Sequence, residues 1–270
     1  MCRKKVDKKK LAPYNTPMTI QPIILAAGNS TRMKSPQSKV LLDIWGRSII
    51  QRVVDVIHRS GLMHPIIVIN KNGRDIQEAL GRDYRYVIQQ PQLGTGHAVA
   101  VTQSAIKNRA DHILVLYGDE PFISSETLQK LIQTHEAKNA TLTLVTYYCP
   151  SFESDNQALY DFGRILRDPE GNIIGIRELK DCTEEEKKIT EVNPSFFIFR
   201  AAWLWENVNR ISNQNSQKEY YLTDLVAAAV QQGEPIASYS STNTIEALGV
   251  NTPQQLERAR RLALTLKPPA

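Results

Sequence analysis

The amino-acid sequence predicts an α/β protein with a Rossmann-like, mainly parallel mixed sheet, helices on both faces and a more antiparallel second half. In the first half, apolar runs of strand length alternate with amphipathic stretches of helix length. These runs are almost wholly apolar, which is typical of parallel strands covered on both faces. In the second half, short apolar runs flank a strong turn signal, which indicates antiparallel pairing.

The elements of the first half follow from these runs in order. Strands are expected at 22–27, 65–69, 84–88, 112–117 and 140–147, and helices at 48–60, 73–81, 96–108 and 124–138. The last of these helices has a clear start, because Ser124 or Ser125 can cap it and Glu126 lies in its first turn.

The second half is less regular. Two short strands are expected within 162–179, around the turn at 168–172, and an apolar run follows at 192–200. Helices are expected at 201–210, 220–232 and 252–266, the last capped by Thr252 with Pro253 in its first turn. No linker rich in Gly, Ser or Pro divides the chain, so we expect one domain over 20–266.

The composition is that of an ordinary globular chain. Of its 270 residues, 41% are hydrophobic and 23% are charged, which is sufficient for a sizeable core. No apolar run reaches the roughly 20 residues of a membrane span. No apolar segment follows the basic N-terminus, as a secretory signal would require. We therefore expect a cytoplasmic protein.

The net charge of +5 comes from the N-terminus alone, because residues 1–10 hold six Lys or Arg and one Asp. We expect a basic, disordered leader over 1–19, with binding to an acidic partner as the alternative. Nucleic acid is not an expected partner of the folded part. The cysteines Cys2, Cys149 and Cys182 fit neither a disulfide scaffold nor a zinc site, so we expect reduced thiols.

Three polar loops that carry glycine follow predicted strands. They read AAGNSTR from Ala26, QQPQLGTGH from Gln89 and YGDEP from Tyr117. The carboxyl ends of parallel strands meet at one edge of a sheet, where open α/β sheets bind their ligands. The three loops together therefore predict a ligand site at that edge.

The first loop has the features of a phosphate cradle. Gly28 lets the backbone come close to a ligand, and the N–H groups after it can point at phosphate oxygens. Arg32 and Lys39 add positive charge suited to a polyphosphate, whereas Lys34 is expected to be a solvated bystander. Neither the Walker loop nor the dinucleotide fingerprint is present. Taken alone, the loop is equally compatible with a cradle and with a plain connecting turn.

Asp119 and Gln89 indicate further chemistry. Asp119 ends an apolar strand, where a carboxylate needs a partner. Mg²⁺ is a natural partner, and capping of the next helix is the alternative.

Gln89 carries a donor and an acceptor on one amide, as recognition of uracil requires. Gln90 and Gln92 could serve as well, and a solvent-facing glutamine is the plain alternative.

A set of motifs supports a more specific interpretation. LAAGNSTRM, SKVL, QQPQLGTGHAVA, YGDEP, FGRI, ELKDCT, EYYLTD and GVN occur in this order over about 22–262. Together they resemble the N-terminal domain of bacterial N-acetylglucosamine-1-phosphate uridylyltransferases, which are usually bifunctional sugar nucleotidyltransferases. The resemblance implies the nucleotide-diphospho-sugar transferase fold.

The resemblance also implies a reaction. A sugar 1-phosphate oxygen attacks the α-phosphorus of UTP with the help of Mg²⁺. The products are pyrophosphate and UDP-N-acetylglucosamine, a precursor of peptidoglycan and lipopolysaccharide. The partners are therefore UTP and N-acetylglucosamine 1-phosphate. Positioning and charge compensation suffice for such a transfer, without a nucleophilic side chain.

The matching positions take roles by this resemblance. Arg32 and Lys39 are the expected catalytic residues, which bind and neutralise the triphosphate, and Asp119 and Asn251 are the expected metal ligands. Uracil would be read by Gln89, Gly94 and Thr95, and N-acetylglucosamine held by Gly163, Glu178 and Asn193. The full set of expected substrate-binding residues is Leu25, Ala26, Gly28, Lys39, Gln89, Gly94, Thr95, Tyr117, Gly118, Asp119, Gly163, Glu178, Asn193 and Asn251.

Three positions depart from the family pattern. Ser30 replaces the usual second glycine of the first loop, where serine can keep the turn if its backbone stays at negative φ. Ser38 replaces a proline before Lys39. Pro194 and Ser195 follow Asn193 where the family continues with threonine and glycine. Proline removes a backbone donor and fixes φ beside the sugar site, which leaves the identity of the sugar open.

The family's C-terminal left-handed β-helix, which carries the acetyltransferase activity, has no counterpart in this sequence. We therefore expect no acetyltransferase activity. We also expect a monomer, because the family trimerises through that half. A Mg²⁺-dependent uridylyltransferase for N-acetylglucosamine 1-phosphate is the leading hypothesis. The alternatives are a nucleotidyltransferase for another sugar 1-phosphate and a non-catalytic nucleotide-sugar-binding domain.

Overall fold

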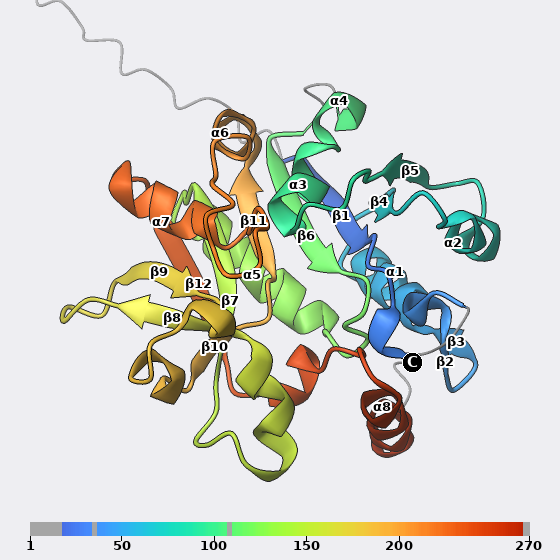
Figure 1. Cartoon of the computed structure of the whole chain (residues 1–270). Coiled ribbons are helices and arrows are strands. Elements are labelled where there is room, and N and C mark those ends of the chain that lie inside the picture. The colour runs from blue at the N-terminus through green and yellow to red at the C-terminus, as the bar shows by residue number, and fades with distance from the viewer. Residues whose placement is uncertain (1–17, 34–36, 107–109, 267–270) are drawn as a thin grey trace, which may run out of the picture.

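A ten-stranded mixed sheet runs through the molecule (Figure 1). The computed structural model describes residues 18–33, 37–106 and 110–266. Residues 1–17 of the predicted leader and Lys34 lie outside these ranges. The strand order is β5-β4-β1-β6-β11-β7-β10-β8-β9, with β12 beside β7. The strands are β1 (Ile20–Ala26), β4 (Ile66–Ile69), β5 (Arg85–Ile88), β6 (His112–Tyr117), β7 (Leu142–Tyr148), β8 (Gly163–Arg167), β9 (Ile173–Arg177), β10 (Glu191–Asn193), β11 (Phe197–Arg200) and β12 (Ile236–Ser241).

The two halves of the sheet differ in strand direction. In the first half, β1 lies parallel between β4 and β6, and β5 is parallel to β4. In the second half, β11 lies antiparallel between β6 and β7, and β10, β8 and β9 continue the antiparallel pairing. The strand β12 returns parallel to β7. The prediction of a mixed sheet with a more antiparallel second half is confirmed.

Helices cover both faces of the sheet. On one face, α1 (Ile49–Arg59), α2 (Arg74–Leu80) and α5 (Ser125–Ala137) pack with Ile24 and Ala26 of β1. On the other, α3 (Thr95–Ala100), α4 (Gln103–Ile106), α6 (Ala201–Asn207) and α7 (Asp224–Gln231) pack with Ile23 and Leu25. Successive residues of a strand point to opposite faces, so β1 is buried on both sides.

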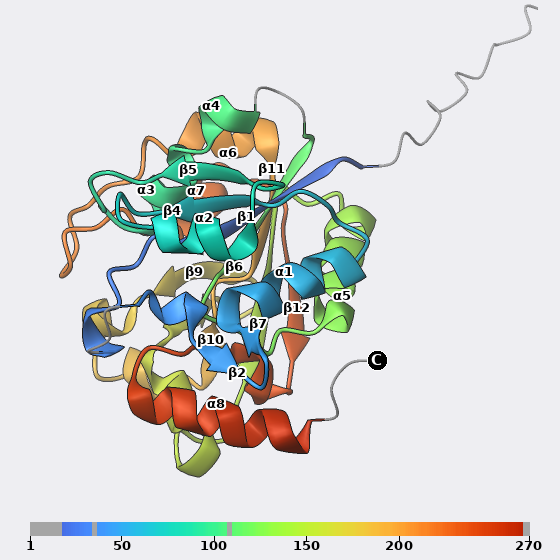
Figure 2. The same cartoon turned by 90° about the vertical axis from the view of Figure 1, so that its right-hand side faces the viewer.

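A third layer lies away from the sheet. The helix α8 (Pro253–Thr265) packs through Leu256 against Ile44 of a separate hairpin formed by β2 (Asp43–Ile44) and β3 (Arg47–Ser48). Figure 2 shows α8 lying across the molecule next to β2. This packing anchors the end of the described chain close to its first loop.

The helix predicted at 96–108 is broken into α3 and α4. The side chain of Thr102 is buried in the turn between them and donates its hydroxyl to the carbonyl oxygen of Val99 at 2.7 Å. Such a bond to the local backbone competes with continuation of the helix. The prediction of one continuous helix was therefore wrong.

The apolar run at 192–200 also divides, into β10 and β11. Pro194 cannot donate a ladder hydrogen bond, and Ser195 has a positive φ of 74°. The helix predicted at 201–210 ends earlier, at Asn207, and the one predicted at 220–232 begins later, at Asp224.

Two general predictions can be compared with the described part of the chain. None of its helices has the length and apolar character needed to cross a membrane. Cys149 and Cys182 are free thiols, as predicted, and Cys2 lies outside the described residues.

Candidate active site

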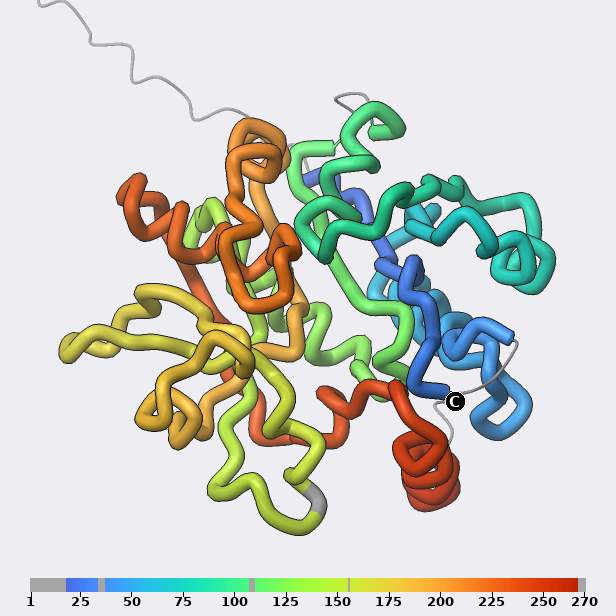
Figure 3. Tube along the Cα trace, viewed as in Figure 1, coloured from blue at the N-terminus to red at the C-terminus, as the bar shows by residue number. Residues whose placement is uncertain are grey.

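A cavity of about 600 Å³ lies at the carboxyl ends of β1 and β6. Loops of the first half form one wall, together with Asn251, which is bonded to Arg32 and Lys39. Residues between 162 and 221 form the other wall. In Figure 3, most of the yellow and orange part of the chain lies opposite the blue part. Most predicted site residues line this cavity: Leu25, Ala26, Gly28, Arg32, Lys39, Gln89, Gly94, Thr95, Tyr117, Asp119, Glu178 and Asn251. The fold thus brings them together at the predicted edge, while their individual roles stay predictions.

Three predicted residues do not line the cavity. Gly118 lies against β1, to which it donates a backbone hydrogen bond at the Leu25 carbonyl (2.9 Å). Gly163 lies beside Glu178, because a Cβ on Gly163 would come within 3.5 Å of the Glu178 Oε1 atom. Asn193 is only 1% exposed. Its amide donates to the Val145 carbonyl (2.9 Å) and accepts from the Ser195 N–H (3.0 Å).

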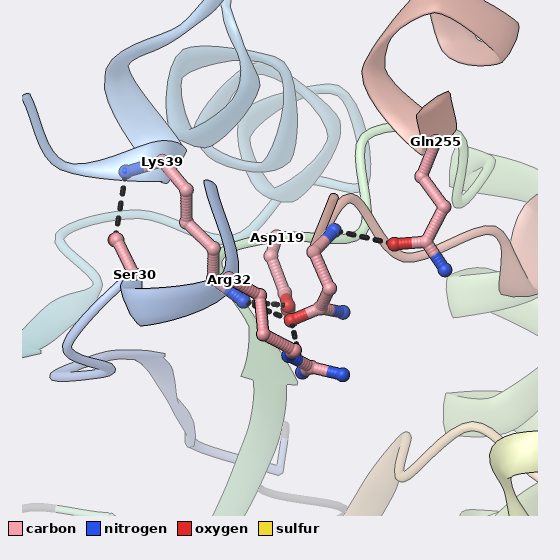
Figure 4. Close-up of polar contacts among 6 residues, drawn as sticks. Ser30, Arg32, Lys39, Asp119 and Gln255 are labelled. Carbon is pink, nitrogen blue, oxygen red and sulfur yellow. Dashed lines mark hydrogen bonds and ion pairs between the residues drawn. The ribbon is translucent and has the colours of Figure 1, made fainter. Parts of the chain in front are cut away.

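A charged cluster lines the cavity (Figure 4). The ammonium nitrogen of Lys39 lies 2.5 Å from Asp119 Oδ2 and 2.5 Å from Asn251 Oδ1. Arg32 donates to the same Asn251 oxygen at 2.8 Å. The side chains of Lys39 and Asp119 are each 14% exposed, so this ion pair is shielded from most of the solvent.

The first loop positions Lys39 through Ser30. The Lys39 N–H donates to Ser30 Oγ at 2.9 Å, and the Lys39 side chain lies against Gly28, whose added Cβ would be 4.0 Å from Lys39 Cε. The condition of negative φ at Ser30 is not met, since its φ is 55°. The hydrogen bond to Lys39 offsets part of the strain that a left-handed conformation places on a residue other than glycine.

Asn251 is held from two directions. Its backbone N–H donates to Gln255 Oε1 at 2.7 Å (Figure 4). The preceding residue, Val250, donates its N–H to the Asp119 carbonyl at 2.9 Å. Thr252 then caps α8 by accepting from the Gln255 N–H. These bonds fix the end of the chain against the loop that carries Asp119.

The donor set of the cluster fits a divalent cation. Asp119 and Asn251 direct a carboxylate and a carboxamide oxygen at one point, which the Lys39 ammonium nitrogen occupies. Such oxygens suit Mg²⁺, which usually completes its shell with phosphate and water. Among the described residues, no group of three or more His, Cys, Asp or Glu side chains could hold a metal ion. A cation here would therefore depend on oxygens from a ligand or from residues of other types.

Glu120 also lines the cavity and was not among the predicted site residues. It is 3% exposed, and its Oε2 atom has no hydrogen-bond partner among the described residues. Burial, and then the negative charge of Asp119, raise the pKa of the Glu120 carboxyl well above its usual value, against an opposing effect of Lys39.

Gln89 lies on the wall predicted to read uracil. It is 5% exposed, and its Nε2 atom donates to the Gly94 carbonyl (2.9 Å) and lies 3.2 Å from His97 Nδ1. The donor of the amide is thus engaged within the protein. Both a donor and an acceptor were expected at Gln89, and in this arrangement the side chain offers only its oxygen to a ligand.

The Gly94–Thr95 turn is held by a distant segment. Gly94 has a φ of 106°, and a Cβ there would lie 2.7 Å from the backbone oxygen of Tyr220. The Tyr220 N–H donates to the Leu93 carbonyl (2.8 Å), and the Leu222 N–H donates to Thr95 Oγ1 (3.0 Å). Only glycine combines this φ with such a close backbone approach.

The opposite wall carries hydroxyl and carboxylate groups. Glu178 Oε1 accepts from Thr223 Oγ1 at 2.8 Å. Burial raises the pKa of Glu178, and this hydrogen bond partly opposes the shift. The Tyr117 hydroxyl lies near Thr95 and Ser195, and burial raises the pKa of Tyr117 above its usual value. This arrangement presents several groups able to bind sugar hydroxyls.

Several lining residues were not predicted. They include Glu120, Pro194, Ser195, Gln217, Glu219 and Tyr221. Glu219 and Tyr221 belong to the EYYLTD motif. Pro194 and Ser195 are the positions after Asn193 where the sequence departs from the family pattern. The sequence therefore carried a signal for these four residues. For Glu120, the signal was a second carboxylate directly after a strand-end aspartate.

Comparisons with known proteins agree with this geometry. Residues 22–172 match the model of the MobA-like NTP transferase domain. Proteins named bifunctional protein GlmU from Exiguobacterium sp. and Caldicellulosiruptor saccharolyticus are 34% and 39% identical to this chain over 89% and 87% of its length. The alignments cover 52% and 50% of those proteins, so the chain spans about half the length of the curated relatives it matches. The resemblance inferred from the motifs is confirmed.

Two solved structures share the fold. One is a putative glucose-1-phosphate thymidylyltransferase from Bacillus anthracis in complex with a sucrose, and the other is UDP-glucose pyrophosphorylase complexed with UDP-glucose. Each superposes with a TM-score of 0.73 at 17% identity. The alignments cover 93% and 92% of this chain and 98% and 99% of those chains.

Proposed function

The chain belongs to the MobA-like NTP transferase domain family, and from this membership we propose that it is a uridylyltransferase. Its substrates are UTP and N-acetylglucosamine 1-phosphate, and its products are UDP-N-acetylglucosamine and pyrophosphate. The observation that carries the proposal is the convergence of Arg32, Lys39, Asp119 and Asn251 in one cavity between the two halves of the sheet. A domain that only binds a nucleotide sugar does not need this complete set of charges.

The proposed mechanism depends on charge compensation. Transfer of a nucleotidyl group places negative charge on the α-phosphate and on the leaving pyrophosphate, and fixed cations stabilise that charge. Arg32 and Lys39 both lie beside Asn251, where they can reach a bound triphosphate. On nucleotide binding, Lys39 would exchange Asp119 and Asn251 for phosphate oxygens.

We propose Asp119 and Asn251 as the ligands of Mg²⁺. When bound, Mg²⁺ would neutralise phosphate charge and orient the triphosphate. Val250 and Gln255 hold the backbone around Asn251, and this rigidity would keep the two oxygens aligned. The Gln89 oxygen and the Gly94–Thr95 turn would bind the uracil.

The other wall would hold the sugar. Glu178 and the hydroxyls of Tyr117 and Ser195 can bind sugar hydroxyls and the acetamido group. Asn193 would act indirectly, because its amide already supports the turn at Pro194 and Ser195. Since Pro194 and Ser195 themselves line the cavity, a nucleotidyltransferase for a different sugar 1-phosphate is the second candidate.

Pyrophosphate release tests the proposal. The full chain is incubated with Mg²⁺, each of the four common NTPs and a panel of sugar 1-phosphates. Turnover that requires both UTP and N-acetylglucosamine 1-phosphate is expected. Absence of turnover with every pair would refute an enzymatic function. Turnover with glucose 1-phosphate but not with its N-acetylamino analogue would refute the assigned sugar and favour the second candidate.

The remaining expectations stay predictions. They are the monomeric state, the cytoplasmic location and the assignment of one domain over 20–266 after a basic leader.

A further inference from the structure

Glu120 occupies a position beside the proposed cation site that the mechanism does not use. It follows Asp119 directly after β6, lines the same cavity and is 3% exposed. The inference drawn from it rests on the proposed function, since Asp119 and Asn251 are the metal ligands of that proposal.

The chain brings Glu120 and Asn251 close together. Gly249 lies between them, because a Cβ on Gly249 would be 3.4 Å from Asn251 Nδ2 and 3.9 Å from Glu120 Cγ. The hydrogen bond from the Val250 N–H to the Asp119 carbonyl holds the two segments together. Asp119, Glu120 and Asn251 therefore line neighbouring parts of the same cavity wall.

Glu120 lacks the partners that a buried carboxylate normally has. Its Oε2 atom has no hydrogen-bond partner among the described residues. Glu246 provides the contrast within the same protein. It is 4% exposed, and its Oε2 atom accepts from Thr127 Oγ1 (2.6 Å) and Tyr147 Oη (2.9 Å). An unpartnered buried carboxylate is costly, so a partner from outside the chain is the expected compensation at Glu120.

A divalent cation fits this position better than a protein cation does. Lys39 is already bound to Asp119 and Asn251. An ionised carboxylate only accepts hydrogen bonds and would repel the phosphates of a nucleotide. A hard cation takes several oxygen ligands and would neutralise both adjacent carboxylates.

We propose that Glu120 is a third protein oxygen donor to the divalent cation held by Asp119 and Asn251, and that it allows this chain to bind the cation before nucleotide arrives. Three protein oxygens give an affinity that does not depend on phosphate oxygens. The Lys39 ammonium group leaves the site when the cation enters.

Mn²⁺ titration followed by electron paramagnetic resonance tests this assignment, with the full chain and without nucleotide or sugar. We compare the wild type with Glu120→Gln, Asp119→Asn and Glu136→Gln, a control on an exposed position of α5. The wild type is expected to bind one Mn²⁺ that excess Mg²⁺ displaces. Glu120→Gln and Asp119→Asn should each weaken binding at least tenfold, and Glu136→Gln should not change it.

A second measurement covers the stability of the variants. Mg²⁺ alone should raise the thermal midpoint of the wild type and of Glu136→Gln, and should do so much less for Glu120→Gln. Equal Mn²⁺ affinity of Glu120→Gln and wild type, or no binding by the wild type without nucleotide, would overturn the assignment.

Pyrophosphate release on the same preparations separates this inference from the proposed function. If the wild type turns over while Glu120→Gln keeps wild-type Mn²⁺ affinity, the inference fails and the function stands. If Glu120→Gln loses Mn²⁺ but the wild type shows no turnover with any substrate pair, the function fails and the inference stands.

Discussion

Replacing Lys39 by methionine should affect catalysis and cation binding in opposite directions. Methionine keeps much of the length of the side chain but removes its charge. Loss of one preorganised donor to developing charge costs roughly 2.7–4 kcal/mol, or about 10²–10³ in kcat, so kcat/KM for UTP should fall by about that factor. In the free protein, the Lys39 ammonium nitrogen lies 2.5 Å from Asp119 Oδ2 and from Asn251 Oδ1, where it competes with a cation.

The gain in cation affinity can be bounded from the same contacts. A hydrogen bond to a charged group contributes about 1.5–3 kcal/mol, and each 1.4 kcal/mol is about tenfold in affinity. Lys39→Met should therefore bind Mn²⁺ about 10–100-fold more tightly without nucleotide. Steady-state kinetics and the Mn²⁺ titration measure the two effects, with the exposed Lys130→Met as control. An unchanged kcat/KM, or weaker Mn²⁺ binding, would show that Lys39 does not hold the place of the cation.

Five further perturbations have defined outcomes. Asp119→Asn should lower kcat at least about 10²-fold, because a neutral amide is a poorer cation ligand; near-normal rates at low Mg²⁺ contradict that role. Glu178→Gln should raise KM for the sugar phosphate about 10–100-fold through a lost charged hydrogen bond, with KM for UTP unchanged. Gly94→Ala should lower the free energy of unfolding by about 2–4 kcal/mol from strain and overpacking, measured in urea. Gly233→Ala, with positive φ but nothing within 4 Å of an added Cβ, should lose about 1–2 kcal/mol from strain alone. Burial, His112 and Arg200 lower the pKa of His135 to about 3, so acidification from pH 7 to 5 should cost about 1–2 kcal/mol of stability.

The sign of the pH effect follows from proton binding. The pKa of His135 is lower in the folded state than its ordinary value near 6.5, so the unfolded chain takes up the proton first. The contribution of His135 to stability is therefore fully present above about pH 6.5 and is lost as the pH falls toward 3. Urea unfolding at pH 5, 6 and 7 should show this slope, and His135→Gln should flatten it. Equal slopes for both proteins would assign the pH dependence to other groups.

Local chemistry explains why much of the fold could be predicted. Ser124 caps α5 by accepting from the Thr127 N–H, and Thr252 caps α8 with Pro253 in its first turn. These signals lie within a few residues of the element they define, so the sequence displays them directly. The strand β12 carries no such signal. Its residues are mostly half-buried, and its pairing with β7 is a tertiary contact.

The sequence could predict which loops meet at the site but not the contacts that their side chains make there. Lys39 and Asp119 could be assigned to one edge because parallel strands align their carboxyl ends there. The Oε2 atom of Glu120 has no hydrogen-bond partner among the described residues, and the left-handed backbone of Ser30 accompanies a hydrogen bond from the Lys39 N–H. Both depend on packing, which a linear pattern does not display. The orientation of Asn193 is also a matter of packing, and its amide serves the protein backbone.

The hydrogen bond between Arg32 and Asn251 spans 219 positions of the chain, so its two partners are synthesised at different times. The first loop leaves the ribosome long before Asn251 is translated, so a nascent chain exposes Lys39 and Asp119 without their later partner. Closing such a long loop is entropically costly and slow. A chain that stops before Asn251, by a premature stop codon or by proteolysis, would carry the nucleotide wall but not a complete site. Catalytic competence would thus appear only after Asn251 has been translated.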